Sequence, residues 1–437
     1  MTQSRSGWLT ILPSGKWYLH AARLPIAFSA RRRVVAQVGP YAQKKRIHLG
    51  LPPVQTGRIR TRIRWRVWND QISIGPLIGI LTVGEGLEFR GNRDNFRDIF
   101  LSGKKLGALV YVFTPSGIDW EQHKVSGYLY DEKQEAWLEA TLPFPHVVYN
   151  RIPTRKWEKQ SDVLKTLNQF ASMKQITLFN RRFFNKQSLF QRLEGIPEAT
   201  TFLPETKRLD SFARLKAFLS QHRSVYLKPV LGKAGEGIMR LDFYQSRWRL
   251  RRVHEQRAIT CYFSTLRGAW KYIRQRTSGK KYIIQQAIPL AKYKGRPFDV
   301  RVLVQKNGTG VWDVTGIGIR RAGANSITTH VPRGGSIHSA KKVLGELFPE
   351  QEEEMMKKIG DTALTIAENL NEVVEDLAEM SMDLGLTKEG RLWFFEANAK
   401  PEKFDEPTIR RSSLSNLIGY AQYVYKHGGE KKEAAAG

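Results

Sequence analysis

The sequence predicts an α+β protein of several domains, and three observations support this class. Residues 1–70 consist of short runs typical of strands, residues 72–165 have a strand-helix-strand order, and residues 166–427 mix both patterns. A chain of 437 residues is long enough for two to four domains, each with a core of its own.

The composition indicates a folded protein of a reducing compartment. Hydrophobic residues make up 41% and aromatic residues 11% of the chain, which excludes a disordered protein. The single cysteine, Cys261, excludes internal disulfides and a cysteine-rich zinc site. The N-terminal residues lack a signal-peptide pattern, and no apolar run reaches the roughly 18 residues needed to span a bilayer. We therefore expect an intracellular protein without a membrane span.

The N-terminal region, residues 1–70, is strongly basic. It holds 14 Lys and Arg residues and one acid, Asp70, in a chain whose formal net charge is +30. Arginine alternates with other residues from Arg58 to Arg66, so a strand there would carry five arginines on one face. Such a face would attract nucleic acid, an acidic polymer or an acidic protein surface. A solvated basic face without a dedicated partner is the alternative.

The second region, residues 72–165, begins with a buried-strand pattern at Pro76–Val83. An amphipathic helix is expected around residues 93–105, and a second strand at residues 108–113. This order predicts a parallel sheet with a helical crossover. At the other end of the chain, the composition of residues 428–437 predicts a disordered tail.

A glycine-rich segment follows a strand that ends near Lys228. Glycines at positions 232, 235 and 237 would let backbone N–H groups approach phosphate oxygens, and Lys228 would add a positive charge. The segment is not a Walker loop, because no Gly-Lys-Ser/Thr opens a helix. A glycine-rich hairpin loop beside a surface lysine is the alternative.

A second constellation lies on the strand at Arg296–Val304. Its alternation places Asp299 and Arg301 on one face, and a further strand ends in Arg320. An arginine held by a carboxylate can stabilise the charge that develops on a transferred phosphoryl group. A purely structural Asp–Arg pair is the alternative.

The third constellation is the predicted hairpin from Met382 to Pro401. Glu396 and Asn398 lie two residues apart and therefore on one face of a strand. If the turn centres on residues 388–389, Asp383 opposes Phe394 and lies one diagonal step from Glu396. Carboxylate and amide oxygens in this arrangement suit Mg²⁺. A sheet edge with polar residues facing water is the alternative.

The order of these motifs resembles the ATP-grasp superfamily from about residue 170 to 425. In detail the chain is similar to the YheC/YheD family of endospore coat-associated proteins, on the segments Leu203–Thr206, Gln286–Leu290 and Phe395–Asn398. The resemblance implies an ATP-grasp fold, in which two α+β subdomains clamp ATP. It also implies that residues 72–165 are the small α/β domain that precedes the grasp module.

The resemblance further implies a role for particular residues. The phosphates of ATP would face Lys186 and Lys228, under a loop that includes Gly232, Lys233, Gly235 and Gly237. The adenine would lie against Gln285, Gln286 and Ile288. Two Mg²⁺ ions would be held by Asp383, Glu396 and Asn398. The catalytic arginines beside the γ-phosphate would be Arg301 and Arg320.

The implied chemistry is carboxylate–amine ligation through an acyl phosphate, which requires no side-chain nucleophile. Neither the acid nor the amine is identified by the sequence. His330 stands near the position where related ligases usually have asparagine, which leaves substrate binding in question. The alternative function is a structural protein of the spore coat with a degenerate, non-catalytic or merely nucleotide-binding grasp domain. An acidic polymer or a coat protein is then the expected partner of the basic N-terminal region, with nucleic acid as the less favoured one.

Overall fold

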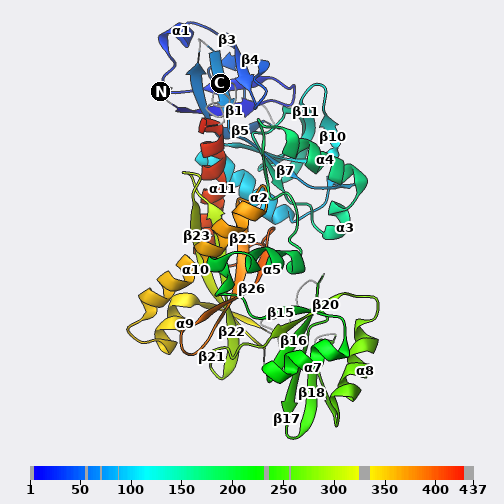
Figure 1. The fold of residues 1–437 in the computed structure, drawn as a ribbon. Helices are drawn as coiled ribbons and strands as arrows, with labels where there is room; N and C mark the ends of the chain where they lie inside the picture. Colours follow the sequence, from blue (N-terminus) through cyan, green and yellow to red (C-terminus); the bar gives the residue numbers. More distant parts are fainter. Residues whose placement is uncertain are drawn as a thin grey trace.

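The computed structural model describes residues 4–54, 58–68, 71–86, 88–230, 236–254, 257–323 and 335–427. Helices and strands are mixed along the chain, which confirms the predicted α+β class. Figure 1 shows an elongated molecule with the N-terminal strands at one end and residues 206–286 at the other.

The N-terminal strands close into a barrel in the order β1-β2-β4-β3-β6-β5. They are β1 (Arg5–Ile11), β2 (Trp17–His20), β3 (Arg33–Val38), β4 (Gln43–Leu49), β5 (Ile59–Trp68) and β6 (Gln71–Gly75), with the short helix α1 (Ile26–Ser29) after β2. Alternate residues fill the barrel, while Arg60 and Arg62 on β5 are exposed, so the predicted alternation is confirmed. Because β6 belongs to the barrel, we propose that the first domain extends to Gly75.

The second domain is a six-stranded sheet in the order β12-β11-β10-β7-β13-β14. Its elements are β7 (Leu77–Leu81), β8 (Gly84–Glu85), β9 (Glu88–Phe89), α2 (Arg93–Leu106), β10 (Leu109–Asp119), β11 (Lys124–Asp131), β12 (Ala136–Pro143), β13 (Val147–Asn150), α3 (Arg155–Glu158), α4 (Ser161–Ser172) and β14 (Thr177–Phe179). Strand β7 is parallel to β10 and β13, and β13 is parallel to β14, which confirms the predicted crossover unit. The carboxyl ends of β7, β13 and β14 therefore share one edge of the sheet.

Helix α2, the crossover helix, has clear start and stop signals. The side chain of Asn92 accepts a hydrogen bond from the Asn95 backbone N–H at 3.0 Å, which caps the first turn. The helix ends at Gly107, whose φ of +102° is a left-handed conformation that glycine adopts without strain. Phe96 and Phe100 are buried on its inner face. The capped N-terminus of α2 lies at the same edge as the carboxyl end of β7.

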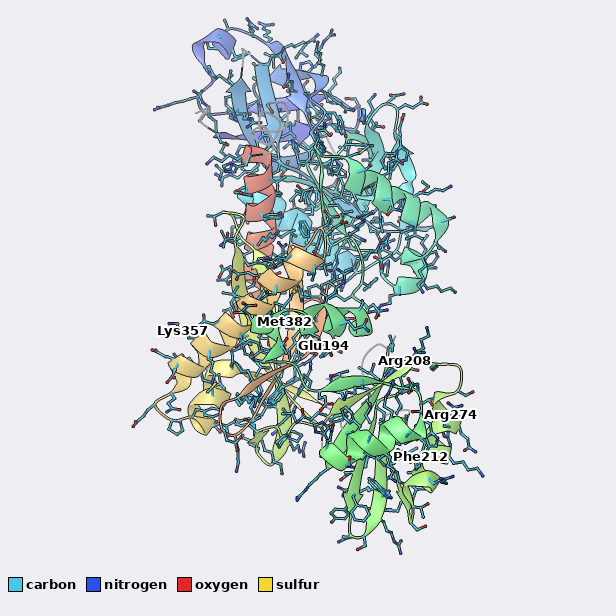
Figure 2. All side chains as sticks on the ribbon, viewed as in Figure 1. Glu194, Arg208, Phe212, Arg274, Lys357 and Met382 are labelled. Carbon is cyan, nitrogen blue, oxygen red and sulfur yellow. The ribbon has the colours of Figure 1, made fainter. Side chains whose placement is uncertain are left out.

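Residues 206–286 form a separate α+β subdomain. Its elements are β15 (Thr206–Leu209), α7 (Phe212–Gln221), β16 (Ser224–Pro229), β17 (Met239–Tyr244), β18 (Arg247–His254), β19 (Arg257–Phe263), α8 (Leu266–Thr277) and β20 (Tyr282–Gln286). Leu215 and Ile273 of the two helices pack on Val225 and Leu227 of β16. Lys228 therefore projects from the opposite, helix-free face of the sheet. Figure 2 shows Phe212 and Arg274 on this subdomain, away from the body that carries Met382.

The C-terminal sheet has the order β24-β23-β22-β25-β26. This body comprises α5 (Lys186–Glu194), α6 (Pro197–Thr200), β21 (Lys292–Tyr293), β22 (Arg296–Lys306), β23 (Trp312–Arg321), β24 (Ser336–Ser339), α9 (Ala340–Leu347), α10 (Glu352–Val373), β25 (Glu379–Leu386), β26 (Leu392–Asn398) and α11 (Pro407–His427). Ile359, Ile366 and Leu370 of α10 pack on the sheet in one core. This sheet presents the predicted hairpin and both predicted arginines.

Helix α11 connects the C-terminal sheet to the barrel (Figure 1). Leu417 and Ile418 join the core that the barrel shares with the second domain. At the far end of α11, the Tyr425 hydroxyl donates to the Ser73 carbonyl at 2.9 Å, and the Arg66 guanidinium lies over the Tyr425 ring. The helix therefore fixes these parts of the chain together. None of the described helices is both long enough and apolar enough to cross a membrane.

Candidate active site

The C-terminal sheet aligns the predicted metal ligands and arginines across adjacent strands. Arg301 on β22 opposes Asp383 on β25, and Asp383 opposes Glu396 on β26. Directly opposed residues project from the same face of a sheet. Asn398 lies two residues after Glu396 and therefore projects from that face as well.

The register of the β25–β26 hairpin differs from the prediction. Asp383 opposes Glu396 directly, Leu384 opposes Phe394, and the register shifts between these two pairs. The predicted pairing of Asp383 with Phe394 is therefore wrong. There are two causes. One is a three-residue loop, in which the Thr387 N–H donates to the Arg391 carbonyl at 3.0 Å and Gly390 has a φ of +75°. The other is the bulge between Asp383 and Leu384, which moves the register by one residue more. The observed register brings the two carboxylates closer than the predicted one.

Asp383 also joins the two predicted arginines. Its Oδ2 lies 2.5 Å from the Arg320 Nη2, and its Oδ1 lies 3.4 Å from the Arg301 Nη1. Arg320 in turn donates to both carboxylate oxygens of Asp299, each at 3.1 Å. The sequence predicted that Asp299 and Arg301 share a face, but the carboxylate that contacts Arg301 is Asp383, and Asp299 holds Arg320.

The environment of Arg320 keeps it charged. Burial by itself lowers the pKa of this guanidinium, but the carboxylates of Asp383 and Asp299 outweigh burial and raise the pKa well above its ordinary value. Asp383 and Asp299 are 3% and 6% exposed, so each buried carboxylate has a cationic partner. Arg320 is therefore a fixed positive charge beside Asp383.

Lys228 of the smaller subdomain is positioned by two consecutive hydrogen bonds within that subdomain. Its ammonium donates to the Gln285 Oε1 at 2.5 Å, and the Gln285 side chain donates to the Thr206 hydroxyl at 2.9 Å. The same ammonium lies 5.4 Å from the ring centroid of Phe395 on β26. Lys228 therefore reaches from the subdomain toward the strand that carries Glu396.

The predicted adenine residues lie at the end of β20. The Gln286 N–H donates to the Glu205 carbonyl at 2.9 Å, and Ile288 is buried. The side chain of Gln285 is 1% exposed and is engaged by Lys228 and Thr206, so it positions the lysine in this structure. A contact of these residues with adenine stays a prediction.

Only part of the predicted phosphate loop can be located. Gly237 has a φ of +73°, and a Cβ there would lie 2.8 Å from the Tyr282 hydroxyl, which itself donates to the Gly237 carbonyl. Gly232, Lys233 and Gly235 lie outside the described residues, as does His330. Lys186 begins helix α5, but its side chain also lies outside the described part. The left-handed backbone at position 237 therefore favours glycine, and a Cβ there would also press against the Tyr282 hydroxyl.

A cavity of about 850 Å³ opens in front of this face of the C-terminal sheet. One wall consists of Arg301, Arg320, Glu396 and Asn398, together with the segment from Lys400 to Glu406. The opposite wall comes from the second domain, with Asn92 of the α2 N-terminus and residues 151–156. The cavity therefore lies between two domains.

The basic residues of the second wall were not predicted from the sequence. Arg151, Arg155 and Lys156 directly follow β13, and the carboxyl ends of parallel strands are a common place for ligand sites. This position is the signal that could have identified them. Arg151 is also structural, since it donates to the Pro401 carbonyl at 2.9 Å and lies 3.4 Å from the carboxylate of Glu379.

Lys400 was not predicted either, although it lies two residues after Asn398. Its buried ammonium lies 3.2 Å from the Glu158 carboxylate and 4.3 Å from the Phe183 ring centroid. Burial lowers the pKa of Lys400 to about 8, against the opposing effect of Glu158. This ion pair links the cavity wall of the C-terminal sheet to helix α3.

The oxygen donors at this site fit magnesium. Asp383 and Glu396 supply carboxylates and Asn398 an amide oxygen, and Mg²⁺ usually binds one or two carboxylates and completes its shell with water and phosphate oxygens. A carboxylate has about four lone-pair positions, so Asp383 can accept from two arginines and still ligate an ion. Within the described residues no group of three or more His, Cys, Asp or Glu side chains gathers as a metal cluster. A metal ion here would therefore be held by the two carboxylates, by the Asn398 amide oxygen and by oxygen ligands from water or phosphate.

Comparison with known proteins identifies relatives of this chain. The sequence model of the family described as "YheC/D like ATP-grasp" matches residues 175–424. The endospore coat-associated protein YheD of Bacillus subtilis (strain 168) is 31% identical over 378 residues, which cover 84% of this chain and 82% of the relative. The endospore coat-associated protein YheC of the same organism is 21% identical over 326 residues, which cover 73% of this chain and 89% of the relative.

Solved structures show a more distant likeness. The D-alanine-D-alanine ligase from Coxiella burnetii is similar with a TM-score of 0.49 and 11% identity, over 82% of this chain and 97% of the ligase. The D-cycloserine synthetase DcsG is similar with a TM-score of 0.46 and 12% identity, over 79% of this chain and 99% of the synthetase.

Proposed function

This chain belongs to the YheC/D-like ATP-grasp family, and from that premise we propose that it is an ATP- and Mg²⁺-dependent carboxylate–amine ligase. The observation that carries the proposal is a cavity lined by Arg301, Arg320, Glu396 and Asn398, with the buried carboxylate of Asp383 against both arginines. The arginines supply positive charge where a phosphoryl group would be transferred, and the oxygen donors suit the ion that accompanies ATP.

ATP would bind between the smaller subdomain and the C-terminal sheet. Lys228, which already approaches Phe395 of β26, would face the phosphates together with Lys186. The loop with Gly232, Lys233, Gly235 and Gly237 would place backbone N–H groups against phosphate oxygens. Gln285, Gln286 and Ile288 would line the adenine side, where the buried Ile288 offers apolar contact.

The metal site would be formed by Asp383, Glu396 and Asn398, with two Mg²⁺ ions as the family implies. When bound, the ions would supply positive charge that neutralises the phosphates. Asp299 keeps Arg320 oriented beside Asp383 through its two hydrogen bonds of 3.1 Å. Arg320 therefore places its positive charge beside the proposed metal site while the carboxylates of Asp299 and Asp383 keep their positions.

The reaction would proceed in two displacements. A carboxylate oxygen of the first substrate attacks the γ-phosphorus, and the bond from this phosphorus to the bridging oxygen of ADP breaks. The amine of the second substrate then attacks the acyl carbon, the amide forms, and phosphate leaves as the amine loses a proton. Arg301 and Arg320 would stabilise the negative charge on the transferred phosphoryl and on the departing phosphate. Both substrates would bind in the cavity of about 850 Å³ between the two domains, beside these arginines.

The location of the protein is proposed from its relatives. Both Bacillus subtilis relatives are named endospore coat-associated proteins, and we propose that this chain also acts at the spore coat. That naming by location also favours a second function, a coat protein that binds nucleotide without turnover. The two functions differ in whether ADP is released.

The test is an ADP-release assay with the small-molecule and peptide fraction of sporulating cells as the source of both substrates. Hydroxylamine is added to trap the acyl phosphate as a hydroxamate. We expect the wild-type protein to release ADP and form hydroxamate in step, and the Glu396→Gln variant to do neither. Glu389→Gln is the matched control, because Glu389 is an exposed residue of the same hairpin.

The opposite result would support the coat-protein alternative. A protein that binds Mg²⁺ and nucleotide, yet releases no more ADP with the fraction than without it, is a binding protein and not a ligase.

A further inference from the structure

The outer face of the N-terminal barrel carries a surface that the ligase proposal does not use. Figure 1 shows the barrel at the end of the molecule opposite the smaller subdomain, so this face is remote from the proposed nucleotide site. The sequence from Ser4 to Gly75 contains 14 Lys and Arg residues and one acid, Asp70. Three of these arginines lie in rows across adjacent strands, together with aromatic side chains.

The first row crosses strands β5, β1, β2, β4 and β3. Each residue of this row lies opposite the next one on the neighbouring strand. The residues are, in order, Arg60, Thr10, Tyr18, His48 and Arg33. Opposed residues share a face, so the row has an arginine at each end and two rings between them. The Tyr18 and His48 rings stack with centroids 4.6 Å apart and planes 19° apart. Both rings are half-buried and so present part of their surface to solvent.

The second row lies beside the first and consists of Arg62, Trp8 and His20. The Arg60 guanidinium lies 4.3 Å and that of Arg62 5.7 Å from the Trp8 ring centroid. Stacking on an indole holds a guanidinium flat while leaving its N–H groups free to donate. The two arginines are exposed, and within the described residues neither forms an ion pair with a carboxylate.

The surroundings add further positive charge. Lys44 and Arg46 are exposed on β4. Burial, Arg33 and Lys16 together lower the pKa of His48, so this imidazole is neutral at physiological pH and serves as a flat ring. The face thus combines cations with flat rings.

We propose that this face, defined by Trp8, Tyr18, His48, Arg33, Arg60 and Arg62, binds single-stranded nucleic acid. Arginines along a row contact the phosphates, and unpaired bases stack on the rings and on the flat guanidinium groups. An acidic polypeptide would satisfy the charge but not use the rings. A duplex would supply phosphates but keep its bases stacked within the helix.

The test measures the anisotropy of labelled oligonucleotides of about 20 nucleotides, one of deoxythymidine and one of uridine, against the full-length protein. We expect both to bind more tightly than a duplex of equal length, with affinity falling as salt rises. The two sugars distinguish DNA from RNA as the preferred strand. The paired variant Arg60→Glu/Arg62→Glu should bind about tenfold or more weakly, with a salt slope shallower by about 0.7 for each lost phosphate contact.

Two further variants separate charge from stacking. Lys216→Glu/Lys271→Glu changes the net charge equally on exposed positions of α7 and α8, and it should leave binding almost unchanged. Tyr18→Leu keeps an apolar side chain but removes the ring, and it should weaken single-strand binding about fivefold or more. Equal thermal unfolding midpoints exclude misfolding as the cause.

Two results would overturn the proposal. Equal losses in the two charge-reversal pairs would show non-specific attraction to the whole basic chain. Full displacement of the oligonucleotide by poly-glutamate, with Tyr18→Leu unchanged, would show a surface for acidic polypeptides instead.

Discussion

At the scale of single residues, Arg320 and Arg301 contact the same carboxylate in different environments. Arg320 holds two carboxylates in the buried part of the sheet, whereas Arg301 contacts Asp383 at 3.4 Å with 19% of its side chain exposed. Removing one partner of a buried ion pair leaves an unpaired charge, which costs far more than losing a partly exposed contact.

We therefore predict that Arg320→Gln lowers the local unfolding free energy of the C-terminal sheet by about 3–5 kcal/mol. Arg301→Gln should lower it by about 1 kcal/mol or less. Native-state hydrogen exchange of the β23 and β25 amides measures both values. Equal losses for the two variants would contradict the unequal burial described above.

Lys400 makes the stability of the fold depend on pH, and the direction of this dependence follows from the pKa of its ammonium. The pKa falls from 10.5 in the unfolded chain to about 8 in the fold, chiefly because the ammonium is buried. Between these two values the unfolded chain binds more protons than the folded protein, so stability rises with pH. Below about pH 8 the lysine is charged in both states and its contribution is constant.

The measurement compares the wild type with Lys400→Met, whose side chain does not titrate. We expect the stability of the wild type relative to the variant to increase by up to about 3 kcal/mol between pH 7 and pH 10. Unfolding midpoints of the two proteins across that range give the difference. A difference that stays constant, or that falls as the pH rises, would show that Lys400 titrates normally.

At the scale of elements, turns decide how the functional residues meet. Gly237 adopts a left-handed conformation against Tyr282, at the end of the proposed phosphate loop. Gly279 has a similar φ of +72° in the same subdomain, but nothing lies within 4 Å of the position of a Cβ there. The two glycines therefore share the backbone cost of substitution and differ in steric contact and in distance from the loop.

We predict that Gly237→Ala raises the Kd for Mg²⁺ and a non-hydrolysable ATP analogue about fivefold or more, because the loop cannot keep its conformation. Gly279→Ala should carry only the backbone cost that the two positions share and should leave the Kd unchanged. Calorimetric titration of both variants provides the values. If the two variants bind the analogue equally, Gly237 is an ordinary turn residue.

The hairpin β25–β26 shows what local sequence can predict. The alternation of polar and apolar residues was sufficient to place Asp383, Glu396 and Asn398 on facing strands of a hairpin. The register was not predictable from that pattern, because a loop of two residues and a loop of three residues fit the same turn composition. The left-handed Gly390 selects the longer loop, and the accompanying bulge brings Asp383 opposite Glu396.

The order of the strands in the C-terminal sheet could not be predicted from the sequence either. Asp299 and Arg301 were assigned to one face correctly, but their partners depend on the strands beside β22. Because β22 lies between β23 and β25, Asp299 meets Arg320 while Arg301 meets Asp383. Local periodicity carries no information about which strands become neighbours.

At the scale of the whole molecule, the cavity arises only when domains come together. The α+β class, the crossover helix and the alternation on β5 could be predicted, since each follows from a pattern within a few consecutive residues. The wall formed by residues 151–156 faces the C-terminal sheet through tertiary packing, and Lys400 meets Glu158 across 242 positions of the chain. Such contacts follow from the assembled fold and not from any one segment.

The assembled fold also explains why nucleotide binding tests the central proposal. Lys228 and the linker come from the smaller subdomain, whereas Asp383, Glu396 and Asn398 come from the C-terminal sheet. In the proposed site, a nucleotide with Mg²⁺ would contact both bodies, so its binding would depend on both. Glu396 contributes to this binding only if it holds the metal.

The most direct measurement is therefore calorimetric titration of the full-length protein with Mg²⁺ and a non-hydrolysable ATP analogue, beside the Glu396→Gln and Glu389→Gln variants. We predict that the wild type and Glu389→Gln bind alike and that Glu396→Gln binds much more weakly. Absence of binding by the wild type at millimolar nucleotide, or unchanged binding by Glu396→Gln, would contradict an ATP- and Mg²⁺-dependent site on this sheet.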